Sequence, residues 1–327
     1  MTVSMAALRN FLSVLVAGFL ITSAPVPACA AEDWPTRPIT LVVSFPAGAI
    51  MDNIGRAIGR EITRVLGQPV VIENRTGGGG SVALSSVARA ASDGYTLLIT
   101  AVGPAVLRPM MDTSVNYDIS REFVPIIMVG DSPNVVLSNP KLGFTNVADL
   151  MRYARQKPEP LTLGYPGPGT MGHLVGLLFA AKAGLKPTYV AYRGSTPLVV
   201  DLLGGQIDIG VVAFSTEHKA VKVLAAATER PVEFLPGVAT LRDSGYPDVV
   251  ASTWNAIFAP AGTPPAIVTK LNTTIDAYLA KPETRAELAQ FGLTTMGGTP
   301  AQVSAMIAAD RAKWGDVIKA GQITVTP

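Results

Sequence analysis

Short apolar runs alternate along this chain with longer segments in which apolar residues recur every three or four positions. The first pattern predicts strands and the second predicts amphipathic helices. Their regular alternation is typical of an α/β protein with a mainly parallel sheet and helices on both faces. The predicted strands cover residues 38–45, 69–73, 95–100, 124–130, 134–138, 161–165, 188–192, 207–212, 222–227 and 253–259; the predicted helices cover 52–66, 80–91, 145–156, 171–184, 196–204, 265–280, 283–290 and 300–319.

The alternation separates into two α/β units. One ends near residue 130, and the final helices, from 264 onward, need its sheet to pack on. We therefore expect residues 31–132 and 253–327 to form domain 1 and residues 133–252 to form domain 2. The chain would then cross between the domains twice, which makes a hinge and leaves a cleft for a ligand.

Two helix ends can be predicted from local residues. Gly67, followed by Gln68 and Pro69, is expected to stop the first helix, because glycine adopts the left-handed conformation that a helix C-terminus favours. Thr263 is expected to be the N-cap of the helix that begins at Pro265.

Residues 1–30 read as a signal peptide. Arg9 gives a positive start, the apolar stretch Phe11 to Ala24 is too short to span a membrane comfortably, and Ala28-Cys29-Ala30 is an A-x-A cleavage site. The mature chain is therefore expected in the periplasm. Two alternatives remain open, namely an uncleaved membrane anchor and a lipoprotein acylated at Cys29.

Composition excludes several classes of function. Cys29 is the only cysteine, so disulfides and thiol catalysis are excluded in the mature chain. The formal net charge is +2, falls to +1 without Arg9, and includes no basic block, so nucleic-acid binding has no electrostatic support. The two histidines, His173 and His218, are not at metal-ligand spacing, and we predict no metal site.

Three turns between a strand and a helix carry the candidate ligand-binding residues. A helix N-terminus offers unpaired backbone N–H groups and a positive dipole end, which together suit a carboxylate. Each feature also has a plainer interpretation, as an ordinary turn, a packed histidine or an exposed arginine. The candidates are Ala47, Gly48, Ala49 and Asp52 in the first turn, Gly167, Gly169, Thr170 and His173 in the second, and Arg193, Gly194 and Ser195 in the third.

The run Gly77–Gly80 looks at first like a phosphate-binding loop. It lacks the lysine of a P-loop and the spacing of a dinucleotide fingerprint, so it indicates close backbone approach rather than a nucleotide cofactor. No nucleophile elbow or local catalytic set is present. We predict a binding protein without catalytic residues or cofactor; an exported hydrolase that uses Asp52 or His173 is the enzyme alternative.

A series of motifs, in order, resembles the Bug/TctC family, the extracytoplasmic receptors of tripartite tricarboxylate transporters. It covers nearly all of the mature chain, from Trp34 to about Trp314. The motifs are Trp34-Pro35-Thr36-Arg37-Pro38-Ile39, Phe45-Pro46-Ala47-Gly48 with Asp52, Glu73-Asn74-Arg75, Asp93-Gly94-Tyr95-Thr96-Leu97-Leu98, His173-Leu174, Tyr192-Arg193-Gly194 with Gly205-Gln206-Ile207-Asp208, Gly245-Tyr246-Pro247 and Ala259-Pro260-Ala261-Gly262-Thr263-Pro264.

The resemblance implies a two-domain periplasmic-binding-protein fold of the Venus-flytrap type, with the ligand in the cleft between the domains. It implies a small carboxylate as ligand, held largely by backbone amides of the turns named above, and one large and one small membrane subunit as partners. We expect a monomer. A sensor that presents its ligand to a signalling partner is the alternative within the same fold.

Three departures from the family pattern bear on the ligand. A second glycine is usual where Ala49 stands, a serine is common in place of Pro166, and a pair of hydroxyl residues is common in the segment Ala101-Val102-Gly103-Pro104. Ala49 can still offer its amide if its φ is negative. The missing hydroxyls predict a less polar pocket, suited to a monocarboxylate with an apolar or aromatic body.

Overall fold

The computed structural model describes residues 34–320, so the predicted signal peptide and Cys29 lie outside the described residues. The strands are β1 (Ile39–Val43), β2 (Val70–Asn74), β3 (Thr96–Ala101), β4 (Phe123–Ser138), β5 (Thr162–Tyr165), β6 (Thr188–Ala191), β7 (Ile209–Ala213), β8 (Lys222–Ala226), β9 (Ser252–Pro260) and β10 (Thr294–Thr295). The α-helices are α2 (Ile50–Leu66), α3 (Ser81–Ala88), α4 (Arg108–Met111), α5 (Val147–Gln156), α6 (Met171–Ala183), α7 (Ser195–Gly204), α8 (Pro265–Leu279), α9 (Pro282–Ala289) and α10 (Pro300–Ala320). Residues 35–320 form one compact unit.

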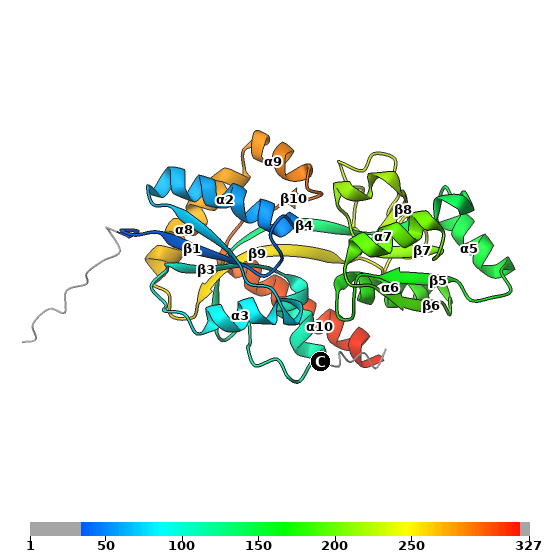
Figure 1. Cartoon of the computed structure of the whole chain (residues 1–327), viewed down its shortest axis with the longest axis horizontal. Helices are drawn as coiled ribbons and strands as arrows, with labels where there is room; N and C mark the ends of the chain where they lie inside the picture. The colour runs from blue at the N-terminus through cyan, green and yellow to red at the C-terminus, as the bar shows by residue number, and fades with distance from the viewer. Residues whose placement is uncertain (1–33, 321–327) are drawn as a thin grey trace, which may run out of the picture. The chain divides into compact units, whose positions relative to one another are not determined.

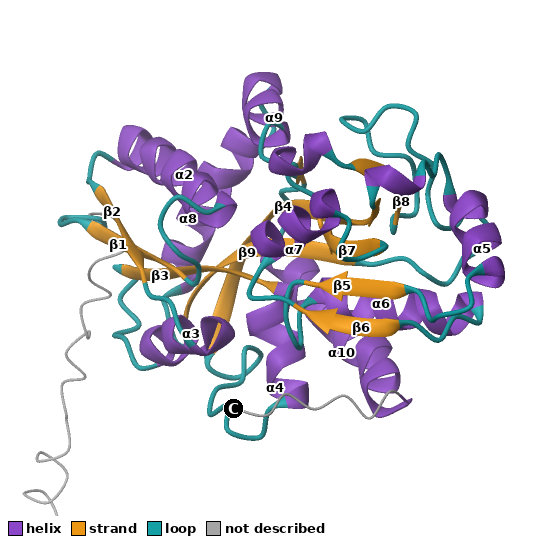
Figure 2. Cartoon of the chain, turned by 45° about the vertical axis from the view of Figure 1, so that its right-hand side comes forward, coloured by secondary structure: helices purple, strands orange, loops and turns teal. Residues whose placement is uncertain are grey.

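The sheet is mixed rather than mainly parallel. Its strand order is β2-β1-β3-β9-β4-β7-β5-β6, with β8 and β10 also pairing with β4. The ladders among β1, β2 and β3 and among β5, β6 and β7 are parallel, as the strand–helix alternation predicts. The ladders between them, which involve β4 and β9, are antiparallel (Figures 1 and 2).

β4 is a single long strand where the sequence predicted two. It pairs with β9 as far as Pro133, which lies opposite Ser252, and it pairs with β7 from Asn134 onward. The segment Gly130–Pro133 resembles a turn in sequence, but its neighbour β9 holds it extended. Pro133 has no N–H to donate, and its carbonyl oxygen accepts a hydrogen bond from the Phe214 N–H at 2.7 Å.

Helices cover both faces of the first group of strands. In Figure 1, α2 and α8 lie on one side of β1, β3 and β9, and α3 and α10 lie on the other. Two glycines let α2 approach closely. A Cβ on Gly55 would lie 3.3 Å from Val43, and one on Gly59 would lie 3.2 Å from Val70.

Helices α6 and α7 cover opposite faces of the second group. A Cβ on Gly176 of α6 would lie 3.0 Å from Leu163, whereas a Cβ on Gly164, the next residue of β5, would lie 3.3 Å from Leu198 of α7. Adjacent strand residues point to opposite faces, so the two helices sandwich β5 and β7. No helix within residues 34–320 has both the length and the apolar character that a membrane crossing needs.

One of the two predicted helix ends is confirmed. Gly67 is the C-cap of α2, with φ of +75°, and its N–H donates to Thr63 O. The prediction for Thr263 is wrong. The N-cap of α8 is Pro264, and the Thr263 hydroxyl instead donates to Pro260 O at 2.8 Å, inside the preceding turn.

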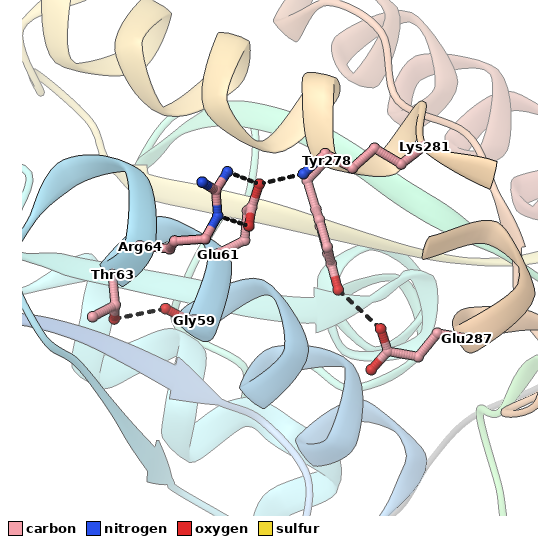
Figure 3. Close-up of polar contacts among 7 residues, drawn as sticks. All are labelled: Gly59, Glu61, Thr63, Arg64, Tyr278, Lys281 and Glu287. Carbon is pink, nitrogen blue, oxygen red and sulfur yellow. Dashed lines mark hydrogen bonds and ion pairs between the residues drawn. The ribbon is translucent and has the colours of Figure 1, made fainter. Parts of the chain in front are cut away.

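An ion-pair network ties α2 to the connection between α8 and α9 (Figure 3). The buried carboxylate of Glu61 accepts two hydrogen bonds from Arg64, both at 2.8 Å, and one from Lys281 Nζ at 2.9 Å. The hydrogen bonds from Arg64 and the one from Lys281 together outweigh the opposing effect of burial. They lower the pKa of Glu61 from 4.5 to about 2.

We predict that Glu61 stabilises the fold most above pH 4.5. Because its pKa is depressed in the folded state, this contribution is lost as the pH falls from 4.5 toward 2. Arg64 and Lys281 are partly exposed, so solvent screening limits the contribution to about 1–2 kcal/mol. Urea unfolding of Glu61→Gln and of the unmodified protein should differ by this amount at pH 7 and by less at pH 3. Glu229→Gln, which breaks the ion pair between two exposed side chains, Arg242 and Glu229, is the control. A pH-independent difference for Glu61→Gln would contradict the prediction.

Candidate functional site

A cavity of about 610 Å³ lies where the loops of the two groups of strands meet beside β4 and β9. Its wall combines small and apolar residues with scattered hydroxyl groups. The lining residues are Ser44, Phe45, Pro46, Ala49, Thr76, Gly77, Gly79, Gly80, Ala101, Val102, Gly103, Pro104, Arg108, Asn134, Pro166, Pro168, Gly169, Thr170, Met171, Gly172, Gly194, Ser195, Thr196, Val212, Ala213 and Thr253.

Four helices begin at this wall. The N-cap residues of α2, α3, α6 and α7 are Ala49, Gly80, Thr170 and Gly194, and all four line the cavity. The first N–H groups of a helix have no partner within it, and the helix dipole is positive there. In α3 the N–H groups of Ser81 and Val82 already donate to Gly78 O and Gly77 O, so the open amides are those of α2, α6 and α7. Ala49 has φ of −69°, so the alanine at this position is accommodated without strain. The wall is therefore suited to an anion.

The structure brings five of the predicted site residues together and leaves six off the wall. Those that line the cavity are Ala49, Gly169, Thr170, Gly194 and Ser195. Those outside the lining are Ala47, Gly48, Asp52, Gly167, His173 and Arg193.

Asp52 holds the first turn in place. Its buried carboxylate accepts hydrogen bonds from the Gly48 N–H at 2.8 Å, from Arg56 Nε at 3.0 Å and from Asn74 Nδ2 at 3.0 Å. Burial opposes ionisation, but the bonds from Arg56, Gly48 and Asn74 outweigh it and lower the pKa of Asp52. Asp52 thus stays ionised and occupies the Gly48 amide itself.

His173 plays a similar part in the second turn. Its ring stacks on Tyr165, with centroids 4.2 Å apart and planes 14° apart, and its Nδ1 accepts the Gly169 N–H at 3.3 Å. Burial lowers the pKa of His173 to about 4, so the ring is neutral at physiological pH. The neutral Nδ1 is what allows it to accept this hydrogen bond.

The turns before α6 and α7 are also bonded to each other. The Thr170 hydroxyl donates to Gly167 O at 2.8 Å, and the Gly194 N–H donates to Pro166 O at 3.1 Å. Arg193 is exposed and is not among the lining residues. The His173 N–H donates to the Thr170 hydroxyl at 3.3 Å, so the amides that remain for a ligand at this end are those of the first residues of α6 and α7.

Asn134 is a lining residue that the sequence did not single out. It is fully buried, its Nδ2 donates to the Thr253 hydroxyl at 2.9 Å, and its Oδ1 has no hydrogen-bond partner within the described residues. Asn134 lies where β4 changes partner from β9 to β7. A polar group thus lies at the base of the cavity beside the strand crossing, in a segment whose apolar neighbours made it look like plain sheet.

Arg108 is the second lining residue that the sequence analysis does not identify. The sequence names Arg193 as the cation near the ligand, but Arg108 is the arginine that lines the cavity. The segment 101–111, which carries Arg108, has no clear helical or strand period, so no helix or strand is predicted there. In the structure it continues from β3 through the short helix Gly103–Leu107 into α4. Within residues 34–320, no three His, Cys, Asp or Glu side chains gather as a metal ion would require.

Comparison with known protein families gives a match over residues 54–323 to the tripartite tricarboxylate transporter family receptor model. Among similar proteins, BugT of Bordetella pertussis is 35% identical over 314 residues, which are 93% of this chain and 95% of that protein. A UPF0065 protein encoded between tcbD and tcbE of a Pseudomonas strain is 34% identical over 91% of this chain and 90% of its own length.

Solved structures of similar proteins share the fold. R. palustris Rpa4515 with adipate has a TM-score of 0.82 and 34% identity, over 89% of this chain and 99% of that one. MatC from Rhodopseudomonas palustris with bound malate has a TM-score of 0.76 and 28% identity, over 87% and 100%. The structure of the periplasmic binding protein BugD gives 0.77 and 29%, over 89% and 99%. The predicted periplasmic-binding-protein fold is confirmed.

Proposed function

Because the chain belongs to the tripartite tricarboxylate transporter receptor family, we propose that it is an extracytoplasmic solute-binding protein for a small carboxylate. It would capture the ligand in the cavity and deliver it to one large and one small membrane subunit. The family and the structural neighbours are binding proteins rather than enzymes. Similar solved structures, such as that of BugD, are of periplasmic proteins, which supports the periplasm as the place where this chain acts. We propose that it acts there as a monomer.

The convergence of the N-termini of α2, α6 and α7 on one cavity carries the proposal. Backbone N–H groups at helix starts bind a carboxylate without a buried ionic partner, so the ligand can also be released. The hydrolase alternative requires Asp52 or His173 at the wall, and both side chains are instead bonded to the turns that support it.

Closure of the cavity would follow from the two strand crossings. We propose the predicted boundaries, residues 31–132 with 253–327 and residues 133–252, as the two moving parts, since β4 changes partner at Pro133–Asn134 and β9 begins at Ser252. Only a closed state brings α2 and α3 and also α6 and α7 against the same ligand. A ligand that prefers this state shifts the population toward it.

The known ligands of relatives suggest which compounds to test. Rpa4515 was solved with adipate and MatC with malate. A thermal-unfolding screen of the mature protein against aliphatic, hydroxylated and aromatic carboxylates should find at least one stabilising compound. At 100 times its Kd, a ligand should add about 2.7 kcal/mol to the free energy of unfolding.

The same screen includes amines and neutral sugars as negative controls. Stabilisation by a carboxylate alone supports the receptor function, and recovery of the unchanged compound afterwards excludes turnover. Stabilisation by a neutral compound, or by no carboxylate in the panel, would contradict the proposal.

A further inference from the structure

Arg108 supplies a full positive charge at a wall otherwise made of neutral groups. Among the described residues that line the cavity, it is the only charged one. Its side chain is 19% exposed, so the guanidinium is largely enclosed by protein and lies at the edge of the cavity. A cation in this setting interacts with an anion more strongly than a surface arginine does, because less water screens the pair.

The glycine run of the sequence explains how this arginine fits. Gly79 has φ of +63°, and a Cβ there would lie 2.9 Å from Arg108 Nη1. Gly80 has φ of +99°, and a Cβ there would lie 2.6 Å from the Pro104 ring. A side chain at Gly80 would displace Pro104 and with it the segment that leads to Arg108, whereas a side chain at Gly79 would push the guanidinium of Arg108 aside. The glycines thus serve close packing, and what they pack against is the cationic part of the wall.

Asp112 orients the guanidinium of Arg108 but occupies only one of its N–H groups. Arg108 Nη2 donates to Asp112 Oδ2 at 2.5 Å, while Asp112 Oδ1 accepts the N–H and the hydroxyl of Ser114 at 2.9 and 2.6 Å. The hydrogen bonds from Ser114 lower the pKa of Asp112, which keeps the carboxylate ionised. Arg108 Nε is buried without a hydrogen-bond partner among the described residues. Nε has no exposed surface, so it is not the group that meets a ligand. A guanidinium has five N–H donors, and its Nη groups offer more of them than the single bond to Asp112 uses, so Arg108 can still bind a further anionic oxygen.

We propose that Arg108 determines specificity by pairing with a second anionic group of the ligand, an inference that rests on the proposed carboxylate-binding function. Arg108 comes from the chain before β4, whereas α6 and α7 follow β4 and offer their N-terminal amides to the same cavity. A ligand that engages both therefore carries two anionic groups separated by a short spacer. This ligand differs from the apolar monocarboxylate that the missing hydroxyls of the sequence predict.

A purely structural pair is the competing interpretation. Arg108 and Asp112 are four residues apart, a spacing at which ion pairs commonly stabilise a helical turn. Loss of such a pair would disturb the wall and weaken all ligands alike. Loss of a specificity residue would weaken only those ligands that carry the second anionic group, so the ratio of two affinities separates the interpretations.

The test measures, by calorimetry, straight-chain diacids of four to nine carbons and the monoacids of equal length. The proteins are the unmodified mature chain, Arg108→Gln, Arg108→Lys and, as a matched control, Arg152→Gln, which breaks an exposed Arg–Asp pair away from the cavity. We expect the unmodified protein to prefer one diacid over its monoacid by about 10-fold or more, the size of one charge-assisted hydrogen bond. Arg108→Gln should reduce this ratio to about one, because the diacid loses far more affinity than the monoacid. Arg108→Lys should keep part of the preference, and Arg152→Gln all of it.

Each other outcome is informative. Equal weakening of diacid and monoacid by Arg108→Gln, or no weakening of either, overturns the role of Arg108. Binding of monoacids alone by the unmodified protein also overturns it, while the proposed receptor function stands. Binding of no carboxylate in the wider screen overturns the receptor function and this inference together.

Discussion

Ser195→Asp should weaken carboxylate binding by about 100-fold or more and leave the fold at least as stable. Ser195 is the first residue of α7 and lines the cavity. An aspartate there faces the positive end of the helix dipole, which stabilises the helix by about 0.3–1 kcal/mol. The same charge repels a bound carboxylate a few ångströms away by about 3–4 kcal/mol at the effective dielectric constant of a protein surface. Each 1.4 kcal/mol is about tenfold in affinity.

Calorimetry with the best carboxylate and thermal unfolding without ligand check both halves of this result. Ala266→Asp is the matched control, because it places the same charge in the first turn of α8, on an exposed residue outside the cavity lining. It should keep its affinity. Ser195→Ala removes the hydroxyl without adding charge and should cost far less than the aspartate. Normal affinity in Ser195→Asp would remove α7 from the binding site.

Asp310→Ala should destabilise the protein by about 2–4 kcal/mol. Asp310 is a buried residue of α10, and its carboxylate accepts the indole N–H of Trp254 at 2.6 Å and that of Trp314 at 3.2 Å. Both tryptophans are among the largest fully buried side chains. Alanine would leave two buried N–H donors without an acceptor, at about 1–3 kcal/mol each, offset in part because a buried carboxyl group also leaves the core. Urea unfolding at neutral pH measures the loss.

The pH dependence of this contribution runs opposite to that of Glu61. Burial raises the pKa of Asp310 above its ordinary value of 3.8, against the opposing effect of the two indoles. A raised pKa in the folded state favours folding fully below the unfolded pKa, and this advantage is lost as the pH rises through the folded value. Relative to Asp310→Asn, which keeps one acceptor and never ionises, the unmodified protein should lose stability as the pH is raised from 4 to 8. A constant difference would show that Asp310 does not change protonation in that range.

Local signals were sufficient for most of the helices. The predicted ranges of α2, α5, α6, α7, α8, α9 and α10 lie within two residues of the observed ones, because their starts and ends depend on residues such as Gly67 that act within one turn. The long strand β4 could not be predicted in this way. Its Gly130–Pro133 segment is extended only because β9, which lies more than a hundred residues later in the chain, pairs with it.

The residues of the candidate site also fall into two groups, those that local sequence identifies and those that depend on distant contacts. Ala49, Thr170 and Gly194 could be found because a strand, a small-residue turn and a helix follow one another in the sequence. Arg108 and Asn134 could not, since their place on the wall depends on how distant segments pack. Arg193 is a candidate in the sequence because it adjoins a recognisable turn, but in the structure its side chain is exposed and does not line the cavity.

The contact between Gly79 and Arg108 suggests how related receptors could acquire new substrates. In the proposed site the helix starts recognise a carboxylate through the backbone, which substitution hardly alters, whereas position 108 presents a side chain that a single codon change can replace. A lineage could thus gain or lose a preference for doubly charged solutes in one step, without rebuilding the pocket. Glycine at position 79 favours this arrangement, because a Cβ there would lie 2.9 Å from Arg108 Nη1 and would push the guanidinium aside, and the φ of +63° would strain any other residue. The two positions are therefore expected to evolve together.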